Sequence, residues 1–213
     1  MNLQALKQST LSDSMKIALP VTIDNEIVAR LVPVGSWILS MPEVICEMSE
    51  WRGRAMRMFL TQFESTPDLT HKYLATFTIG HQDRVLFMIE SCGDFIGHIG
   101  LANVTSESAE VDNLVRGRSG GPPNLMEEIE RTLVTWAFEE LSLDHLYLRI
   151  LSYNLFARLL HESIGFRVTE RRNLRKVNSG DEVVLESCLK EFASVSYTCD
   201  IMVLLKSRFY LEQ

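Results

Sequence analysis

The segment RGRSGGPPN at positions 116–124 limits most strongly what this chain can fold into. Its glycines and prolines make it a loop. The residues before it, AEVDNLV, alternate in part between apolar and polar side chains and predict a strand over 109–115. The residues after it predict a helix over 125–141, because apolar side chains from Leu125 to Ala137 recur at helical spacing. A strand joined to an amphipathic helix by a glycine-rich loop indicates a helix packed on a sheet.

The rest of the chain predicts a single domain over 1–213 of the α/β (α+β) class, with a mixed, mostly antiparallel sheet of about seven strands flanked by helices. The predicted strands cover 26–34, 84–90, 95–104, 109–115, 145–151, 166–177 and 199–207. The predicted helices cover 41–63, 67–79, 125–141 and 155–163. Residues 1–15 are polar and mixed and predict a loosely held segment. Residues 178–197 predict only a loop with a short helix.

Charge and composition argue against several classes of function. The net charge of -7 argues against a nucleic-acid partner, which would favour a basic surface. The sequence has no signal-peptide pattern and no apolar run long enough for a membrane span, so we expect a cytoplasmic protein without membrane contact. The four cysteines form no C-x-x-C pair, so we expect no metal site.

The loop at 116–124 has the chemistry of an anion site. Backbone N–H groups of a glycine-rich loop, together with the N-terminus of the following helix, can bind a phosphate. Arg116 and Arg118 add charges that pair with phosphate oxygens. The alternative is an ordinary strand–helix connection with two solvated arginines. Glu127 and Glu128, in the first helical turn, would repel a phosphate unless they point away from the loop.

Five consecutive stretches carry a resemblance to a known family. They are DFIGHIGLANV, AEVDNLV, RGRSGGPPNLMEEIERTLVTWAF, LDHLYLRILSYN and LFARLLHESIGFRV. In this order they resemble the GNAT superfamily of N-acetyltransferases, and within it the branch that modifies ribosomal-protein N-termini and the enzymes that acetylate amino sugars. The resemblance covers residues 84–172 well, the N-terminal helices loosely, and the region after 178 hardly at all. It implies acetyl-CoA as the cosubstrate.

The resemblance also implies which residues hold coenzyme A. A splayed strand would offer backbone groups to the pantetheine arm, the loop would bind the pyrophosphate, and Asn154 would bond the pantetheine or phosphate part. The implied cofactor-binding residues are Asn113, Leu114, Val115, Arg116, Gly117, Arg118, Ser119, Gly120, Gly121, Asn124, Leu125 and Asn154. One departure is Pro123, which stands where the family has glycine or alanine; with Pro122 it removes two N–H donors from the loop.

Four side chains are candidates for catalysis. Asp112, Glu110 and His98 could accept the proton of the attacking amine, and each has a structural alternative. The two carboxylates share one face of a strand and could be a solvated edge, and His98 could be a hydrogen-bonded core histidine. His161 stands where many family members have a tyrosine that acts as general acid to the leaving thiolate, but it could also be a surface histidine.

The resulting prediction is an acetyl-CoA-dependent N-acetyltransferase that acts on a primary amine of a small molecule, such as an amino sugar or a nucleotide-linked amino sugar. The alternatives are a peptide or protein N-terminal acetyltransferase and a non-catalytic CoA-binding protein. Arg52, Arg54 and Arg57 predict a solvated helix face, with an anionic substrate group as the alternative partner. The apolar stretch at 201–205 is compatible with a homodimer and equally with burial. The sequence leaves the acceptor amine, the acyl chain and the oligomeric state open.

Overall fold

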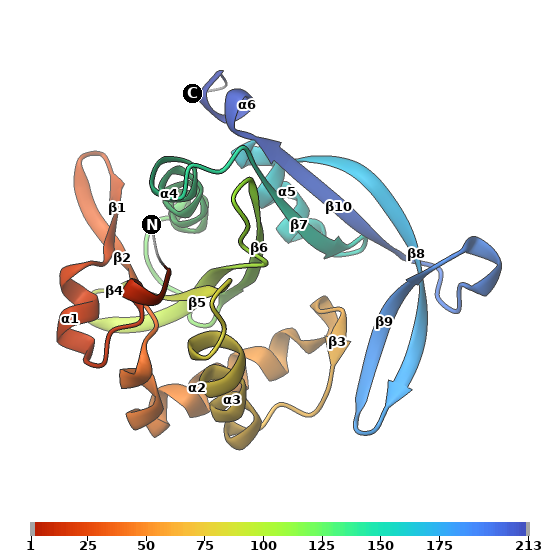
Figure 1. Ribbon diagram of the computed structural model, residues 1–213, viewed down its shortest axis with the longest axis horizontal. Helices are drawn as coiled ribbons and strands as arrows, with labels where there is room; N and C mark the ends of the chain where they lie inside the picture. Colours follow the sequence, from red (N-terminus) through yellow and green to blue (C-terminus); the bar gives the residue numbers. More distant parts are fainter. Residues whose placement is uncertain (1–2, 212–213) are drawn as a thin grey trace.

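The computed structural model describes residues 3–211 and forms one sheet of ten strands with helices on both faces (Figure 1). The strands are β1 (Leu19–Ile23), β2 (Glu26–Pro33), β3 (Thr61–Gln62), β4 (Val85–Ser91), β5 (Asp94–Ala102), β6 (Ser108–Arg116), β7 (His145–Leu151), β8 (Arg167–Ser179), β9 (Glu182–Cys188) and β10 (Thr198–Leu205). The helices are α1 (Leu11–Lys16), α2 (Pro42–Ala55), α3 (Pro67–Tyr73), α4 (Leu125–Glu140), α5 (Leu155–Ile164) and α6 (Lys206–Leu211).

The sheet order is β1-β2-β4-β5-β6-β7-β10-β8-β9-β3. Every neighbouring pair is antiparallel except β6 and β7, which are parallel. The predicted fold class is therefore confirmed, with ten strands among residues 3–211 instead of about seven. No helix in that range is both long and apolar enough to cross a membrane.

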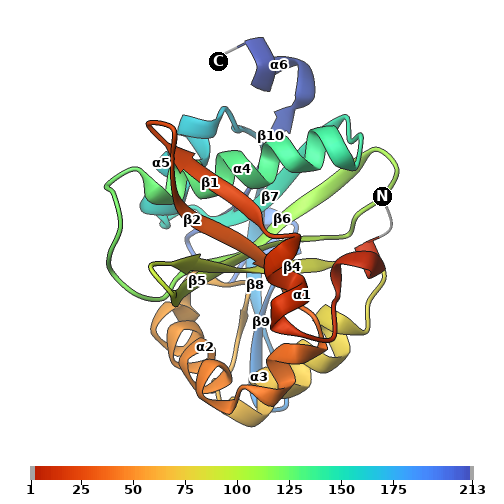
Figure 2. The same ribbon diagram turned by 90° about the vertical axis from the view of Figure 1, so that its left-hand side faces the viewer.

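Alternating side chains of the central strands build two separate cores, one on each face of the sheet. On β4, Phe87 packs into the core that Leu125 and Leu133 of α4 share, whereas Met88 packs into the core that contains Trp51 of α2. Figure 2 shows α4 and α5 on one side of the sheet and α2 and α3 on the other. This period of two follows directly from strand geometry. It fixes which strand residues can meet α2 and α3.

Two N-terminal segments differ from the prediction. Residues 3–16 are not loosely held: they form a 3-10 turn at Leu3–Leu6 and helix α1, because Leu3 and Leu6 are buried in the core. Lys7 also donates to the carbonyl oxygen of Ile79 at 3.1 Å. β1 was not predicted; it forms a hairpin with β2 through Asp24 and Asn25, which both have positive φ, as a tight hairpin turn requires.

The predicted helices 41–63 and 67–79 are present with altered ends. The first ends as an α-helix at Ala55 and continues through a 3-10 turn into the short strand β3. The second begins as predicted, with Thr66 accepting from the N–H of Leu69 at 3.3 Å and Pro67 in the first turn. After Tyr73 it widens into a π-helical turn over Leu74–Ile79. The wider turn comes directly after Tyr73, a residue of the candidate site.

The C-terminal region contains a hairpin that the sequence did not reveal. Strands β8 and β9 extend away from the body of the domain (Figure 1), and β3 pairs with the far side of β9. Residues 182–188 are therefore a strand, followed by a 3-10 turn at Lys190–Phe192, where the sequence predicted a loop with a short helix. The predicted last strand ends at Leu205 and continues as α6.

Candidate active site

A β-bulge interrupts β6 beside the predicted anion loop. Asn113 has φ of 55°, in the left-handed region that asparagine adopts more readily than most residues. The register with β5 shifts between His98 and Gly100, so two residues of β6 lie opposite one residue of β5. The bulge reverses the side-chain alternation of β6, because Val111 lies in the core under α4 whereas Val115 lies in the core under α2.

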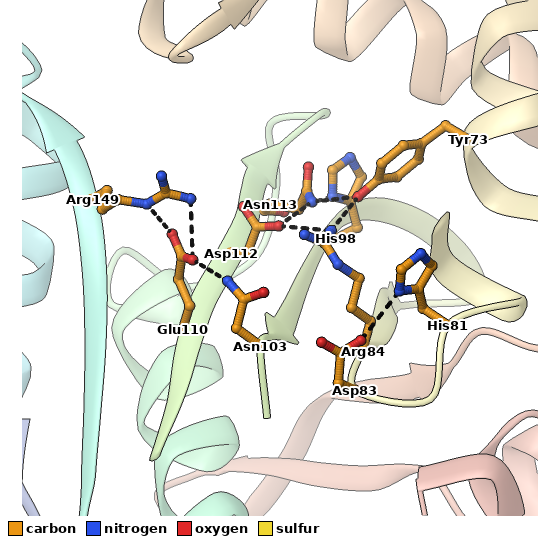
Figure 3. Close-up of polar contacts among 10 residues, drawn as sticks. All are labelled: Tyr73, His81, Asp83, Arg84, His98, Asn103, Glu110, Asp112, Asn113 and Arg149. Carbon is orange, nitrogen blue, oxygen red and sulfur yellow. Dashed lines mark hydrogen bonds and ion pairs between the residues drawn. The ribbon is translucent and has the colours of Figure 1, made fainter. Parts of the chain in front are cut away.

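His98 holds this bulge from the neighbouring strand. Its Nδ1 lies 2.7 Å from the carbonyl oxygen of Asn113 (Figure 3). Its ring stacks on Trp51 with the ring centroids 6.3 Å apart. Burial, with a smaller effect of Arg52, lowers the pKa of His98 to about 4, against the opposing effect of the bond to Asn113. The imidazole is therefore neutral near pH 7, and its Nδ1–H donates to the carbonyl. This geometry favours the hydrogen-bonded core histidine over a strong general base.

Strands β6 and β7 separate just before the bulge. Their parallel pairing covers only Ser108 to Glu110 of β6, whereas β7 remains paired with β10 as far as Leu151. From residue 111 onward, the edge of β6 that faces β7 has no strand partner in the described chain. The predicted splay is thus present at Asn113, Leu114 and Val115. Unpaired strand edges offer backbone N–H and C=O groups to a ligand.

The loop between β6 and α4 is compact and depends on its glycines. Gly120 and Gly121 have φ of 137° and 74°, which disfavours any residue with a side chain. Gly117 lies against α2: a Cβ atom there would meet the Trp51 ring at 2.0 Å. Pro122 and Pro123 close the loop, and Asn124 connects them to Leu125, which is fully buried at the start of α4.

The loop arginines already have partners within the chain. Arg116 donates from its NH2 nitrogen to the carbonyl oxygen of Gly120 at 2.6 Å. Arg118 pairs with Glu47 and lies 3.7 Å from Asp94. Ser119 is exposed next to them. Phosphate binding by Arg118 would therefore compete with two carboxylates.

The start of α4 has no side-chain cap. Asn124 precedes the helix, but its side chain makes no capping hydrogen bond. Glu127 and Glu128 instead face Arg131, at 3.2 Å and 4.0 Å from guanidinium nitrogens. Arg131 compensates both carboxylates one turn into the helix. The first-turn acidic residues are thus paired along α4, which answers the objection that they would repel an anion at the loop.

The two candidate carboxylates of β6 have different surroundings, and neither is a solvated edge (Figure 3). Glu110 is buried and accepts from Nε of Arg149 at 2.6 Å and from Nδ2 of Asn103 at 2.8 Å. Asp112 keeps about a third of its side chain exposed and lies 3.5 Å from a guanidinium nitrogen of Arg84. Asp112 is therefore the more accessible of the two carboxylates.

Asp112 belongs to a cluster that the sequence did not predict. The amide of Asn113 donates to the hydroxyl of Tyr73 at 2.8 Å and to Asp112 at 2.8 Å, and Arg84 contacts the same hydroxyl at 3.4 Å (Figure 3). These residues line a small pocket together with Gly100. Burial, with a smaller effect of Asp112, raises the pKa of Tyr73. The tyrosine is a neutral hydroxyl that can donate or accept.

The two remaining candidates lie on α5. Asn154 caps this helix, since its side-chain oxygen accepts from the N–H of Ala157 at 3.3 Å. His161 is buried rather than on the surface, and its Nδ1 lies 2.6 Å from Glu130 of α4. The second oxygen of Glu130 is buried without a partner in the described residues. Any proton transfer by His161 to a ligand would have to use Nε2.

Comparisons with known proteins agree with this geometry. The model of the acetyltransferase (GNAT) domain family matches residues 41–167. A search of curated protein sequences found no significant match. Among solved structures, the fold is similar to a Salmonella typhimurium acetyltransferase that modifies the N-terminal serine of ribosomal protein L7/L12, with TM-score 0.65 and 9% identity over 88% of this chain and 98% of that one.

Two further structures share the fold. An acetyltransferase of the GNAT family from Bacillus anthracis has TM-score 0.58 and 14% identity over 79% of this chain and 91% of that one. RimL, a ribosomal L7/L12 α-N-protein acetyltransferase in complex with coenzyme A, has TM-score 0.64 and 10% identity over 88% of this chain and 97% of that one. At these identities the likeness concerns the fold alone.

Proposed function

Since this chain belongs to the acetyltransferase (GNAT) family, whose enzymes use acetyl-CoA, we propose that it transfers an acetyl group to the primary amine of a small molecule such as an amino sugar. The proposal rests on three features that follow one another from β6 to α4: the bulge, the separation of β6 from β7, and the glycine-rich loop. These features lie next to a polar pocket at Asp112 and Asn113. A peptide N-terminus is the alternative acceptor.

The residues around the splay fit coenzyme A. The unpartnered edge of β6 at Asn113–Val115 can bond an extended pantetheine arm, and the loop from Arg116 to Asn124 precedes the N-terminus of α4, where anions are favoured. Gly121 leaves no room for a side chain, since a Cβ atom there would meet Leu125 at 2.4 Å. When bound, acetyl-CoA supplies an acetyl group activated as a thioester.

We propose that Asp112 accepts the proton of the amine, because the carboxylate of Asp112 is exposed to the pocket whereas that of Glu110 is held by Arg149 and Asn103. A carboxylate can accept a proton directly or through one water molecule. His98 acts indirectly in this proposal: it holds the Asn113 peptide and so orients the backbone N–H groups that follow the bulge. Such groups can stabilise negative charge on a carbonyl oxygen. His161 is the candidate acid for the thiolate.

Acetyl-CoA is expected to stabilise the protein against heat. Ligand at about 100 times its dissociation constant adds roughly 2.7 kcal/mol to the free energy of unfolding, or roughly 5–10 °C in melting temperature for this size. Thermal melting and calorimetry with acetyl-CoA, with adenosine alone as control, measure this effect. Release of free CoA with a panel of amino sugars and short peptides then identifies the acceptor. No stabilisation and no calorimetric heat would remove the basis of the proposed function.

The Gly117→Ala variant is expected to bind acetyl-CoA about tenfold more weakly, a loss of about 1.4 kcal/mol. Its Cβ atom collides with Trp51, so the loop must move away from α2. The matched control is Gly53→Ala on α2, where the nearest atom lies 3.9 Å away. Calorimetric dissociation constants for both variants test the loop assignment. Equal affinities for acetyl-CoA in the two variants would contradict it.

A further inference from the structure

Arg52 is a half-buried cation that forms no ion pair with a carboxylate of residues 3–211. Its guanidinium group lies 3.3 Å from the ring centroid of Phe59, and one of its NH2 nitrogens donates to the carbonyl oxygen of Thr61 at 3.1 Å. Its Nε is buried and has no hydrogen-bond partner in the described chain. No carboxylate of residues 3–211 lies within ion-pair distance of it. The described structure therefore desolvates this charge without neutralising it.

Other arginines of the described chain do have carboxylate partners. Arg84 pairs with Asp112, Arg149 pairs with Glu110, and Arg172 pairs with Glu170. Burial lowers the pKa of Arg52 to about 10, so the group still carries its charge near neutral pH. A buried charge without a partner is costly, and an anion that arrives with a ligand can recover that cost.

The position of Arg52 connects it to the pocket of the proposed acetyl transfer. Arg52 directly follows Trp51 on α2; the Trp51 ring stacks on His98, and His98 contacts Asn113, which lines the pocket. The charge of Arg52 also interacts with Asp112 and Tyr73 of the same pocket. Asp112 suits a cationic or neutral amine, and Arg52 suits a negative group on the same molecule.

We propose that Arg52 binds an oxyanion of the acceptor, a carboxylate or a phosphate, so that the acceptor is an amine that also carries a negative charge. This inference rests on the proposed acetyltransferase function. It narrows the acceptor class: a neutral amino sugar lacks the group that Arg52 would bind, whereas its phosphate ester, an amino acid or an acidic peptide has it. The planar guanidinium on an aromatic ring is well placed for such a contact, since it is fixed in orientation before the acceptor binds.

Matched pairs of acceptors test the inference. The pairs are γ-aminobutyrate and its amide, glucosamine phosphate and glucosamine, and two peptides that differ only in glutamate or glutamine at the second position. The initial rate of CoA release gives kcat/KM for each. We expect the anionic member of at least one pair to be favoured about tenfold or more, as for a charge-assisted hydrogen bond. Which pair responds distinguishes carboxylate, phosphate and peptide.

Variants separate ligand binding from a structural role of Arg52. Arg52→Met should remove the preference for the anionic member, because the contact with its negative group is lost. The simultaneous loss of the contacts with Phe59 and Thr61 should affect the anionic and the neutral member equally. Arg52→Lys should keep part of the preference. Arg57→Met, at an exposed arginine of the next turn, is the matched control and should change neither.

The outcomes for the two proposals are distinguishable. Equal kcat/KM within every pair, an equal loss for anionic and neutral members in Arg52→Met, or no turnover of any anionic amine by protein that binds acetyl-CoA would each overturn the role of Arg52. Turnover of neutral amines alone would overturn that role and leave acetyl transfer intact. Failure of acetyl-CoA to bind would instead reject the proposed function.

Discussion

Replacing His98 by leucine should lower kcat about a hundredfold, the effect of losing one well-placed donor to a developing oxyanion. His98 does not have to touch the substrate for this to happen. Its Nδ1–H fixes the carbonyl group of Asn113, and the peptide that follows the bulge turns with that carbonyl. Without the donor, the carbonyl oxygen lacks its partner in a buried place and the bulge can relax. Steady-state kinetics with the identified acceptor measure the loss.

His98→Asn is the conservative variant for this test, because an asparagine amide can donate from about the position of Nδ1. We expect it to restore most of the kcat that His98→Leu loses, with KM for acetyl-CoA little changed in both. A merely structural role would instead lower stability in both variants without this split in kcat. Equal losses of kcat in the two variants would mean that His98 acts through Nε2, and the positioning role would be wrong.

The pH dependence of stability gives an independent measurement of the same residue. The folded-state pKa of His98 is about 4 and lies below the ordinary histidine value of 6.5, so the unfolded chain binds the proton more tightly. The neutral His98 therefore contributes roughly 3 kcal/mol to the free energy of unfolding. This contribution is fully present above about pH 6.5 and is lost as the pH falls towards 4. Urea unfolding at several pH values should show this loss in the wild type, and a smaller one in His98→Asn.

The elements that were predicted best are those whose sequence signals lie within one short stretch of the chain. The strand, loop and helix from Ala109 to Glu140 were predictable because the glycines, prolines and apolar period all lie within one stretch. β9 was missed because burial does not alternate along it: Val183, Val184 and Glu186 are all partly buried around the buried Leu185. β3 has only two residues and carries no period at all.

The candidate site was predictable in its backbone and not in its side-chain pairs. Arg149 is 39 residues from Glu110 in sequence, and Tyr73 is 40 residues from Asn113. No spacing rule connects residues so far apart, since their contact depends on the order of strands in the sheet. The bulge has one weak signal in the sequence, Asn113, because asparagine tolerates positive φ. The burial of His161 also required knowledge of where α4 lies.

Asp200→Ala should be the most destabilising of these substitutions, by about 3–5 kcal/mol, because it leaves one member of a buried ion pair without its partner. Asp200 of β10 is fully buried, and it pairs with Arg158 of α5 and approaches Arg171 of β8 at 3.7 Å. Arg158 is mostly buried, and its Nε already lacks a partner in the described chain. Removing the carboxylate therefore leaves the Arg158 guanidinium without a counter-ion between α5 and the sheet. Urea unfolding at neutral pH measures the loss.

Two controls separate the buried charge from simple loss of packing. Arg171→Ala should cost less than about 1 kcal/mol, because that side chain is largely exposed and can be replaced by solvent. The double variant Asp200→Leu with Arg158→Met should be more stable than Asp200→Ala, since it removes both charges and refills the space. A double variant as unstable as Asp200→Ala would assign the loss to shape rather than charge. Because α5 also carries Asn154 and His161, acetyl-CoA affinity should fall with stability in Asp200→Ala and recover in the double variant.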